Sequence, residues 1–402
     1  MSGVFTRLVG QQAVEQELVA AAYAARGDSP HSGTTVGTMT HAWLITGPPG
    51  SGRSVAALCF AAALQCTSDG TPGCGECRAC TTTMAGTHAD VRRIVPEGLS
   101  IAVKEMREIV QIASRRPGTG RWQIVVIEDA DRLTEGAANA LLKVVEEPPP
   151  STVFLLCAPS VDPEDIAITL RSRCRHIALT TPSVDAIADV LISGDGLPEA
   201  DARWAASVSG GHVGRARRLA TDPEARERRK RALGLARDAA TPARAFAAAE
   251  EMVAVAEAEA LALTAGRNET ETEELKTALG AGGTGKGTAA TTRGTAGALK
   301  ELERRQKSRQ TRASRDALDR ALIDLATYFR DALLVSSGAS SVTANHPDMA
   351  EKVQAMADHV PPDRLLRCIE AVLECREALA INVKPKFAVD AMVATIGQAL
   401  RG

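Results

Sequence analysis

The first 180 residues alternate between amphipathic stretches with a helical repeat and short, continuously apolar runs. Residues 10–26 have the helical repeat, with Val14 and Leu18 on one face, and they predict a helix. Further helices are expected near residues 52–66, 102–115 and 134–146. The apolar runs predict buried strands at Ala42–Thr46, Val91–Val95, Gln123–Glu128, Thr152–Cys157 and Arg175–Leu179. Strands that alternate with helices indicate an α/β domain, 1–180, with a parallel sheet covered by helices on both faces.

The chain after Thr181-Pro182 shows only helical spacing. Residues 181–235 predict a small helical module, and residues 236–402 predict an all-α C-terminal domain. Apolar positions recur at helical spacing in 316–335, 348–358, 362–380 and 386–400. We therefore expect three packed domains.

Residues 264–312 interrupt the C-terminal domain and have an unusual composition. They contain no aromatic, Val, Ile, Met or Cys residue, and their centre, Gly280–Gly297, is rich in glycine, threonine and alanine. Because so few apolar side chains are available for packing, we expect a disordered insertion here. At its end, Leu299–Arg315 is strongly basic and predicts a helix. A solvated face and a contact with DNA or a partner would both account for its charge.

Composition excludes several classes of protein. The 402 residues are 45% hydrophobic and 24% charged, as in globular proteins, and their net charge of −2 excludes a basic surface field for nucleic acid. Aromatic residues make up only 3%, which argues against stacking platforms for single-stranded bases. No apolar run approaches the roughly 18 residues of a membrane span, and the start lacks a signal pattern. We expect a cytoplasmic protein with no membrane contact, in which the nine cysteines favour metal over disulfides.

A glycine-rich segment stands directly between the first predicted strand and the next helix. Its residues are Gly47, Pro48, Pro49, Gly50, Ser51, Gly52, Arg53 and Ser54. This is the layout of a phosphate loop, in which backbone N–H groups at a helix N-terminus surround a phosphate of ATP or ADP. Ser54 keeps the hydroxyl that Mg²⁺ would bind. Arg53 replaces the expected lysine with a planar guanidinium that is not equivalent to it, which indicates a relaxed need for catalysis.

Two carboxylates, Glu128 and Asp129, end the buried strand that begins at Gln123. Such a pair is the usual partner of a phosphate loop, with one carboxylate for Mg²⁺ and one to orient the attacking water. In oligomeric ATPases of this kind the order is Asp then Glu, so the base here would be one methylene short. Together with Arg53, this order predicts weak or absent ATP hydrolysis.

Four cysteines follow the phosphate loop at close spacing: Cys66, Cys74, Cys77 and Cys80. Four thiolates with two x2 spacings suit a tetrahedral Zn²⁺ ion. The intervening segment is polar, so a metal would replace the core that it lacks. Free thiols or a redox site are the alternatives.

Further motifs complete the pattern. These are Gly86-Thr87-His88-Ala89-Asp90, the segment Asn139–Pro149, and Ser172-Arg173-Cys174 before the last strand. With the four-cysteine insertion, they resemble the bacterial DNA polymerase III clamp-loader subunits, densely over residues 1–220. The altered phosphate loop and carboxylate pair make the chain more similar to delta-prime than to the hydrolysing gamma/tau subunits. From spacing alone, Arg173 would be a surface salt-bridge residue.

The resemblance implies an AAA+ P-loop domain, a helical lid and an all-α collar that joins five subunits in a ring. It implies that Arg173 is a trans-acting arginine finger on an adjacent gamma/tau subunit's ATP. Val9, Gly10 and Gln11 match the family's segment near the adenine. Arg215 resembles the lid's sensor region, although a structural arginine at a helix start is an equally good interpretation. The implied cofactors are Zn²⁺ and, at the phosphate loop, ATP or ADP with Mg²⁺.

The motifs and the resemblance together predict a delta-prime-like clamp-loader subunit of the DNA polymerase III holoenzyme, a DNA-directed DNA polymerase (nucleotidyltransferase). Its partners would be gamma/tau and delta subunits in a hetero-pentameric ring, the sliding clamp, and primer-template DNA. It would help to load the clamp during replication, with weak or absent ATPase activity of its own. The alternatives are a self-sufficient gamma/tau-like AAA+ ATPase and a zinc-dependent nucleic-acid-binding module, and the near-neutral charge opposes the latter.

Overall fold

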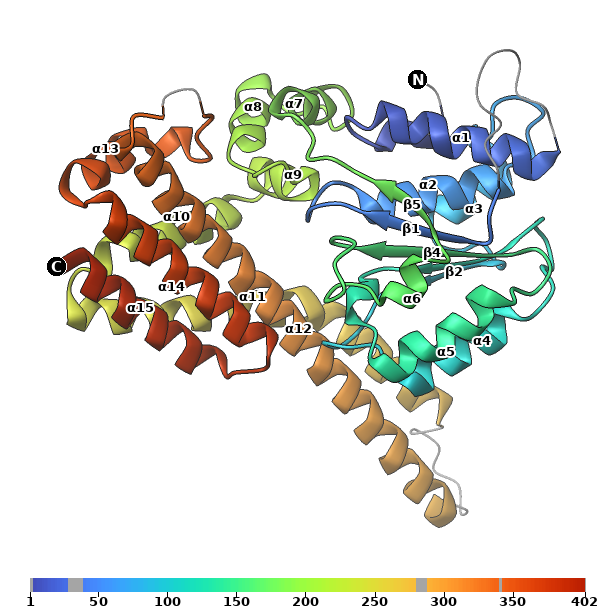
Figure 1. Cartoon of the computed structure of the whole chain (residues 1–402). Helices are drawn as coiled ribbons and strands as arrows, with labels where there is room; N and C mark the ends of the chain where they lie inside the picture. Colours follow the sequence, from blue (N-terminus) through green and yellow to red (C-terminus); the bar gives the residue numbers. More distant parts are fainter. Residues whose placement is uncertain (1–2, 28–38, 280–287, 340–341, 402) are drawn as a thin grey trace. The chain divides into compact units, whose positions relative to one another are not determined.

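Five parallel strands form the sheet of the first unit of the chain. The computed structural model describes residues 3–27, 39–279, 288–339 and 342–401, in two units, Met1–Ala220 and Thr221–Gly402 (Figure 1). The strands are β1 (Ala42–Thr46), β2 (Val91–Ile94), β3 (Gln123–Ile127), β4 (Thr152–Ala158) and β5 (Arg175–Ala178). Their order is β2-β3-β4-β1-β5, and each neighbouring pair is parallel. All five predicted strands are confirmed to within one residue.

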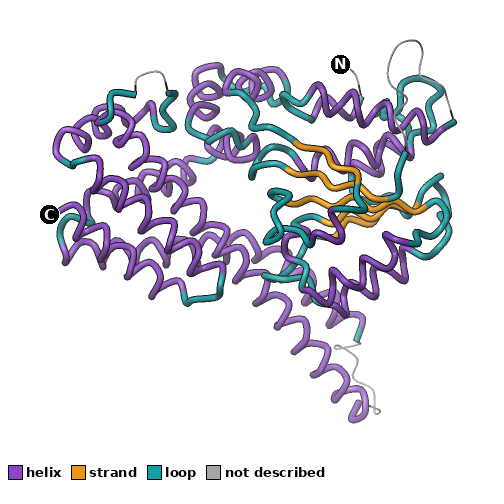
Figure 2. Tube along the Cα trace, in the orientation of Figure 1, coloured by secondary structure: helices purple, strands orange, loops and turns teal. Residues whose placement is uncertain are grey.

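Helices cover both faces of this sheet (Figures 1 and 2). On one face lie α1 (Gln12–Arg26) and α2 (Arg53–Gln65), and on the other lie α4 (Val103–Ala113) and α5 (Glu135–Glu146). Successive residues of a strand point to opposite faces, so in β4 Leu155 packs with α1 and α2 while Phe154 packs with α4 and α5. Because every residue of β1, β3 and β4 is buried, these strands appear in the sequence as continuous apolar runs.

Several short elements were not predicted from the sequence. They are η1 (Val4–Arg7), α3 (Arg78–Met84), η2 (Ala130–Arg132) and α6 (Ile168–Arg171). The first unit ends with α7 (Val184–Ser193), α8 (Glu199–Ser207) and α9 (Val213–Thr221). The next helix, α10 (Pro223–Asp238), belongs to the second unit, so the boundary between the two units falls within the range 181–235 predicted for the lid.

The second unit consists of helices and loops in its described part (Figure 2). After α10 come α11 (Pro242–Ala278), α12 (Thr288–Ser336), η3 (Pro347–Met349), α13 (Ala350–His359), α14 (Pro362–Ala380) and α15 (Pro385–Arg401). Leu322, Phe329, Val372, Val389 and Ile396 are fully buried in its core. This confirms the all-α prediction. Within the described residues, none of the helices has the length and apolar character to cross a membrane.

The expected disorder of residues 264–312 is wrong for the part that the structure describes. Residues 264–278 continue α11, and residues 288–312 form the first half of α12; Gly280–Gly287 lie outside the described residues. Polar contacts join the two helices where apolar side chains are scarce. Arg309 Nη2 donates to Glu271 Oε1 at 3.0 Å, and Gln306 Nε2 donates to the Asn268 carbonyl at 2.9 Å. Hydrogen bonds and ion pairs thus replace the core whose absence led to the prediction of disorder.

A buried polar cluster joins α10 and α12 to the segment before α13. Arg229, 6% exposed, donates to both carboxylate oxygens of Asp348 at 2.7 and 3.0 Å and to His346 Nδ1 at 2.8 Å. His346 Nδ1 must therefore be an acceptor, and Nε2, which lies 2.9 Å from Thr327 Oγ1, carries the proton. Burial, with the nearby Arg229 charge, lowers the pKa of His346, so the imidazole is neutral.

Candidate functional site

The carboxyl edge of the sheet brings together the phosphate-loop segment and the carboxylate pair. Residues Gly47–Ser54 follow β1, and Glu128 and Asp129 follow β3. The loop is tied to the neighbouring strand ends, since Gly47 N–H donates to the Pro159 carbonyl at 3.2 Å. The carboxyl ends of parallel strands are where α/β sheets bind ligands. The two motifs therefore both lie at the carboxyl edge of the sheet.

The loop's conformation depends on glycine, and another segment packs directly against it. Gly50 has φ +88°, and a Cβ atom built there would lie 2.4 Å from His212 Cγ. His212 comes directly before α9, so the segment between α8 and α9 packs against the phosphate loop. No pattern in the sequence indicated this contact.

Arg53 is turned back onto its own loop. Its Nη1 donates to the Gly47 carbonyl at 2.9 Å. The Ser51 hydroxyl is buried and has no hydrogen-bond partner among the described residues. The guanidinium that stands in for the phosphate-binding lysine is thus engaged within the loop.

The carboxylate pair is also engaged. Glu128, 9% exposed, forms an ion pair with Arg93 Nε of the neighbouring strand β2. The hydrogen bond with Glu128 raises the pKa of Arg93. Asp129 has a left-handed backbone, φ 53°, and burial together with the Asp129 charge raises the pKa of Asp131. Arg93 was missed because its contact depends on the register of β2 against β3, which places Arg93 beside Val126.

The N-terminal candidates and Arg215 lie near the strand and lid ends. Val9 is buried, and a Cβ atom on Gly10 would lie 3.7 Å from the Pro182 Cα. Gln11 Nε2 donates to the Thr180 carbonyl at 2.6 Å, which ties this segment to the chain that follows β5. Arg215 N–H donates to His212 Nδ1 at 3.2 Å, so its backbone orients the imidazole that covers the loop.

The four predicted metal ligands come together at the C-terminus of α2 and the start of α3. The Sγ atoms of Cys66, Cys74, Cys77 and Cys80 all lie within 4.8 Å of one another, and Cys77 and Cys66 are 3.9 Å apart. Zinc bound at about 2.3 Å from each sulfur would need separations of about 3.8 Å, so a small inward shift closes the site. Backbone N–H groups point at two of the sulfurs, Cys74 Sγ at 3.3 Å and Cys77 Sγ at 3.4 Å.

The local environment favours thiolates at part of this cluster. Burial raises the pKa of Cys77, but hydrogen bonds from Thr67 and Cys80 outweigh it and bring the pKa to about 6. At Cys66 the pKa is likewise lowered, because backbone hydrogen bonds outweigh burial. Burial raises the pKa of Cys80, so this thiol needs the charge of a metal to lose its proton. The donor set fits Zn²⁺ in a closed Cys₄ site.

The cysteine loop also holds the N-terminal segment. At the end of α1, Arg26 donates to the carbonyls of Cys66, Ser68 and Gly70 at 2.9–3.1 Å. Val4 N–H donates to the Gly73 carbonyl at 2.9 Å. These contacts link the cysteine cluster to the stretch that leads to Val9 and Gly10.

Asp90, the last residue of the predicted Gly86–Asp90 motif, binds a turn between α4 and β3. Its carboxylate accepts from the backbone N–H groups of Gly118, Thr119 and Gly120 at 2.7–2.8 Å, and from Thr119 Oγ1 at 2.8 Å. These hydrogen bonds outweigh burial and lower the pKa of Asp90 to about 2. The motif is thus a structural element beside β2.

Arg173 lies two residues after the end of α6. Its Nη2 lies 2.6 Å from Glu146 Oε1, and its Nη1 donates to the Thr169 carbonyl at 3.0 Å and to Ser172 Oγ at 3.2 Å. The Arg173 side chain remains 40% exposed. The structure shows the surface salt bridge, and the role of Arg173 as a trans-acting arginine finger stays a prediction.

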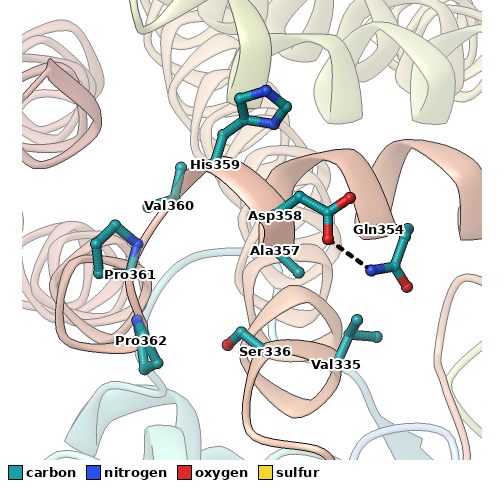
Figure 3. A pocket seen from close by; sticks show the side chains of 9 residues that line it. All are labelled: Val335, Ser336, Gln354, Ala357, Asp358, His359, Val360, Pro361 and Pro362. Carbon is teal, nitrogen blue, oxygen red and sulfur yellow. Dashed lines mark hydrogen bonds between the residues drawn. The ribbon is translucent and has the colours of Figure 1, made fainter.

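A separate hollow of about 410 Å³ lies in the second unit, between the end of α12, α13 and the start of α14 (Figure 3). Its polar lining includes Asp358, which accepts from Gln354 Nε2 at 2.8 Å. His359 Nδ1 donates to the Ala355 carbonyl at 2.7 Å. None of the residues predicted from the sequence as site residues lines it.

Known proteins resemble the chain in both units. Residues 31–183 match the family model described as "DNA polymerase III, delta subunit", and residues 312–385 match "DNA polymerase III, delta subunit, C terminal". The Escherichia coli K12 DNA polymerase III subunit delta' is 39% identical over 145 residues, 35% of this chain and 43% of that protein. The Bacillus subtilis 168 subunit tau is 35% identical over 139 residues, 34% of this chain and 24% of that protein.

Among solved structures, a DNA polymerase III gamma subunit-related protein of Thermotoga maritima matches with a TM-score of 0.40 and 14% identity, over 90% of this chain and 95% of that one. The chain spans about half the length of the curated delta-prime relatives that it matches. The two family models together cover more than half of its residues, and delta-prime subunits of several bacteria are 32–39% identical to it. Residues 31–183 and 312–385 belong to the DNA polymerase III delta-subunit family, and delta-prime and gamma/tau subunits are among the chain's relatives.

Proposed function

We propose that this chain is a delta-prime-like subunit of a DNA polymerase III clamp loader. It would complete a ring with gamma/tau and delta subunits, help to load the sliding clamp onto primed DNA, and present Arg173 to the nucleotide of a neighbouring gamma/tau subunit. Family membership and the delta-prime relatives support the complex to which it would belong.

One observation supports weak or absent ATP hydrolysis by this chain. The side chains with which a phosphate loop would bind nucleotide and Mg²⁺ already contact other groups of the protein. Arg53 donates to the Gly47 carbonyl, and Glu128 is paired with Arg93. A nucleotide with Mg²⁺ would have to break both contacts and displace His212 from Gly50. The proposal therefore assigns this chain weak or no ATP hydrolysis of its own.

Arg173 would act on charge that develops during phosphoryl transfer in the neighbouring subunit. An arginine supplied in trans contributes about 10³–10⁵ in rate in enzymes that use one. Its exposed guanidinium, at the end of a short helix, is suited to reach across an interface. Zn²⁺ at Cys66, Cys74, Cys77 and Cys80 would be structural, because a Cys₄ site leaves no open position for substrate.

The test uses the full chain in a complex reconstituted with its gamma/tau and delta partners. Arg173→Ala should leave assembly intact and strongly reduce DNA-stimulated ATP hydrolysis at the adjacent site. Arg171→Ala removes a neighbouring charge that is also exposed and should change little. Normal hydrolysis with Arg173→Ala would overturn the proposal.

The similarity to the Bacillus subtilis tau subunit supports one alternative, a self-sufficient gamma/tau-like ATPase. In that case the purified chain would hydrolyse ATP steadily, and Arg53→Ala would abolish the activity. The proposal predicts no turnover to lose in this experiment.

A further inference from the structure

Glu146 lies where a helix disfavours an acid. It is the last residue of α5, and Glu147 follows it. The unpaired carbonyls at a helix C-terminus carry partial negative charge, so cations rather than carboxylates are favoured there. A side chain that violates such a local preference often serves a contact elsewhere in the fold.

The contact that Glu146 makes is with Arg173. Glu146 Oε1 lies 2.6 Å from Arg173 Nη2, while the Thr169 carbonyl and Ser172 Oγ take the two N–H groups of Nη1. Groups from α5 and from α6 thus hold the guanidinium at both of its terminal nitrogens. Glu147 is exposed and makes no ion pair within the described part of the chain.

These contacts hold the guanidinium in one orientation and leave part of it available to an anion. Arg173 Nη1 donates two hydrogen bonds, and Nη2 forms the ion pair with Glu146. The Nε–H of Arg173 has no hydrogen-bond partner among the described residues. A side chain already held in one orientation loses less conformational freedom when it meets an anion. More of the free energy of that contact can then lower the barrier to the reaction.

We propose that Glu146 is the positioning residue of Arg173, holding the guanidinium in the orientation in which it meets a phosphoryl group bound by the neighbouring subunit. This inference rests on the proposed function of Arg173. Glu146 touches neither the nucleotide nor the reacting atoms, and it acts through the arginine alone.

The test compares single-turnover ATP hydrolysis by the reconstituted complex for the wild type and three single variants of the full chain. Glu146→Gln should lower the rate at saturating ATP about 3- to 5-fold, the size expected for an exposed ion pair, and leave KM for ATP within about 2-fold. Glu146→Asp keeps the charge on a shorter side chain and should recover part of the rate. Glu147→Gln is the matched control, with the same charge change next to the contact, and should equal the wild type.

A double-variant cycle separates a role through Arg173 from a general structural effect. Glu146→Gln in the Arg173→Ala background should cause no further loss, because the residue that it positions is gone. Assembly and thermal unfolding should be unchanged in each variant. If Arg173→Ala itself is without effect, the proposed function fails. If Arg173→Ala is slow but Glu146→Gln matches Glu147→Gln, exceeds the wild type, or adds to Arg173→Ala, this inference alone is overturned.

Discussion

Replacing Asp90 with asparagine tests how strongly one buried carboxylate holds the first unit together. Asp90 is 5% exposed and receives four hydrogen bonds, three of them from consecutive backbone N–H groups of residues 118–120. Its pKa falls from an ordinary 3.8 to about 2, which at about 1.4 kcal/mol per tenfold change in proton affinity corresponds to roughly 2 kcal/mol of folding stability. Asparagine keeps one acceptor oxygen but directs an N–H₂ group at a backbone donor. We expect Asp90→Asn to lower the free energy of unfolding at pH 7 by about 2–3 kcal/mol.

The sign of the pH dependence follows from the lowered pKa. The contribution of Asp90 is fully present above about pH 5, and it is lost as the pH falls through about 4 towards 2, because the unfolded chain binds the proton first. The difference between wild type and Asp90→Asn should therefore shrink to about half near pH 3.

Urea unfolding followed by tryptophan fluorescence measures this change selectively. The three tryptophans of the chain, Trp43, Trp122 and Trp204, all lie in the first unit, so their signal does not report on the second. Asp69→Asn, at an exposed position in the same unit, is the matched control. A loss below about 0.5 kcal/mol at pH 7, or a difference that stays constant between pH 6 and pH 3, would refute the reasoning.

Three further predictions concern the metal and the second unit. Elemental analysis should find about one zinc per chain, and Cys74→Ser with Cys77→Ser should remove it; zinc retained in that variant would contradict the Cys₄ assignment. Arg309→Ala should increase amide hydrogen exchange near residues 268–276 and 305–312 while leaving the rest of the chain unchanged, and rapid exchange of this region already in the wild type would argue against the α11–α12 contact. Arg229→Met leaves Asp348 without its buried partner and should destabilise the second unit by about 3 kcal/mol, seen as an earlier loss of helical circular dichroism with an unchanged tryptophan transition.

The sequence was sufficient for the sheet because burial on both faces produces an unmistakable pattern. β1 and β3 are apolar at almost every position, and the motifs after them fall at one edge whatever the details of packing. The four cysteines were equally accessible to prediction, since their spacing is local.

Contacts between segments that are far apart in the chain could not be predicted from the sequence. The pairing of Arg93 with Glu128 depends on strand register, and the position of His212 on Gly50 depends on how the lid helices fold back. The expected disorder of 264–312 was wrong for a different reason. It assumed that helices need apolar side chains, whereas α11 and α12 are joined there by residues such as Arg309 and Glu271.

The strand order has a consequence for how the chain is made. The first strand of the chain, β1, pairs with β4 and β5, whose residues are synthesised more than a hundred positions later. The five buried residues Ala42–Thr46 therefore leave the ribosome with no neighbouring strand, and the loop after them cannot take its shape until residue 178 has emerged. The four cysteines lie within fifteen residues of one another, so a metal can close their site long before that point. Zinc binding and the contacts of Arg26 would then organise the N-terminal segment while the sheet is still incomplete.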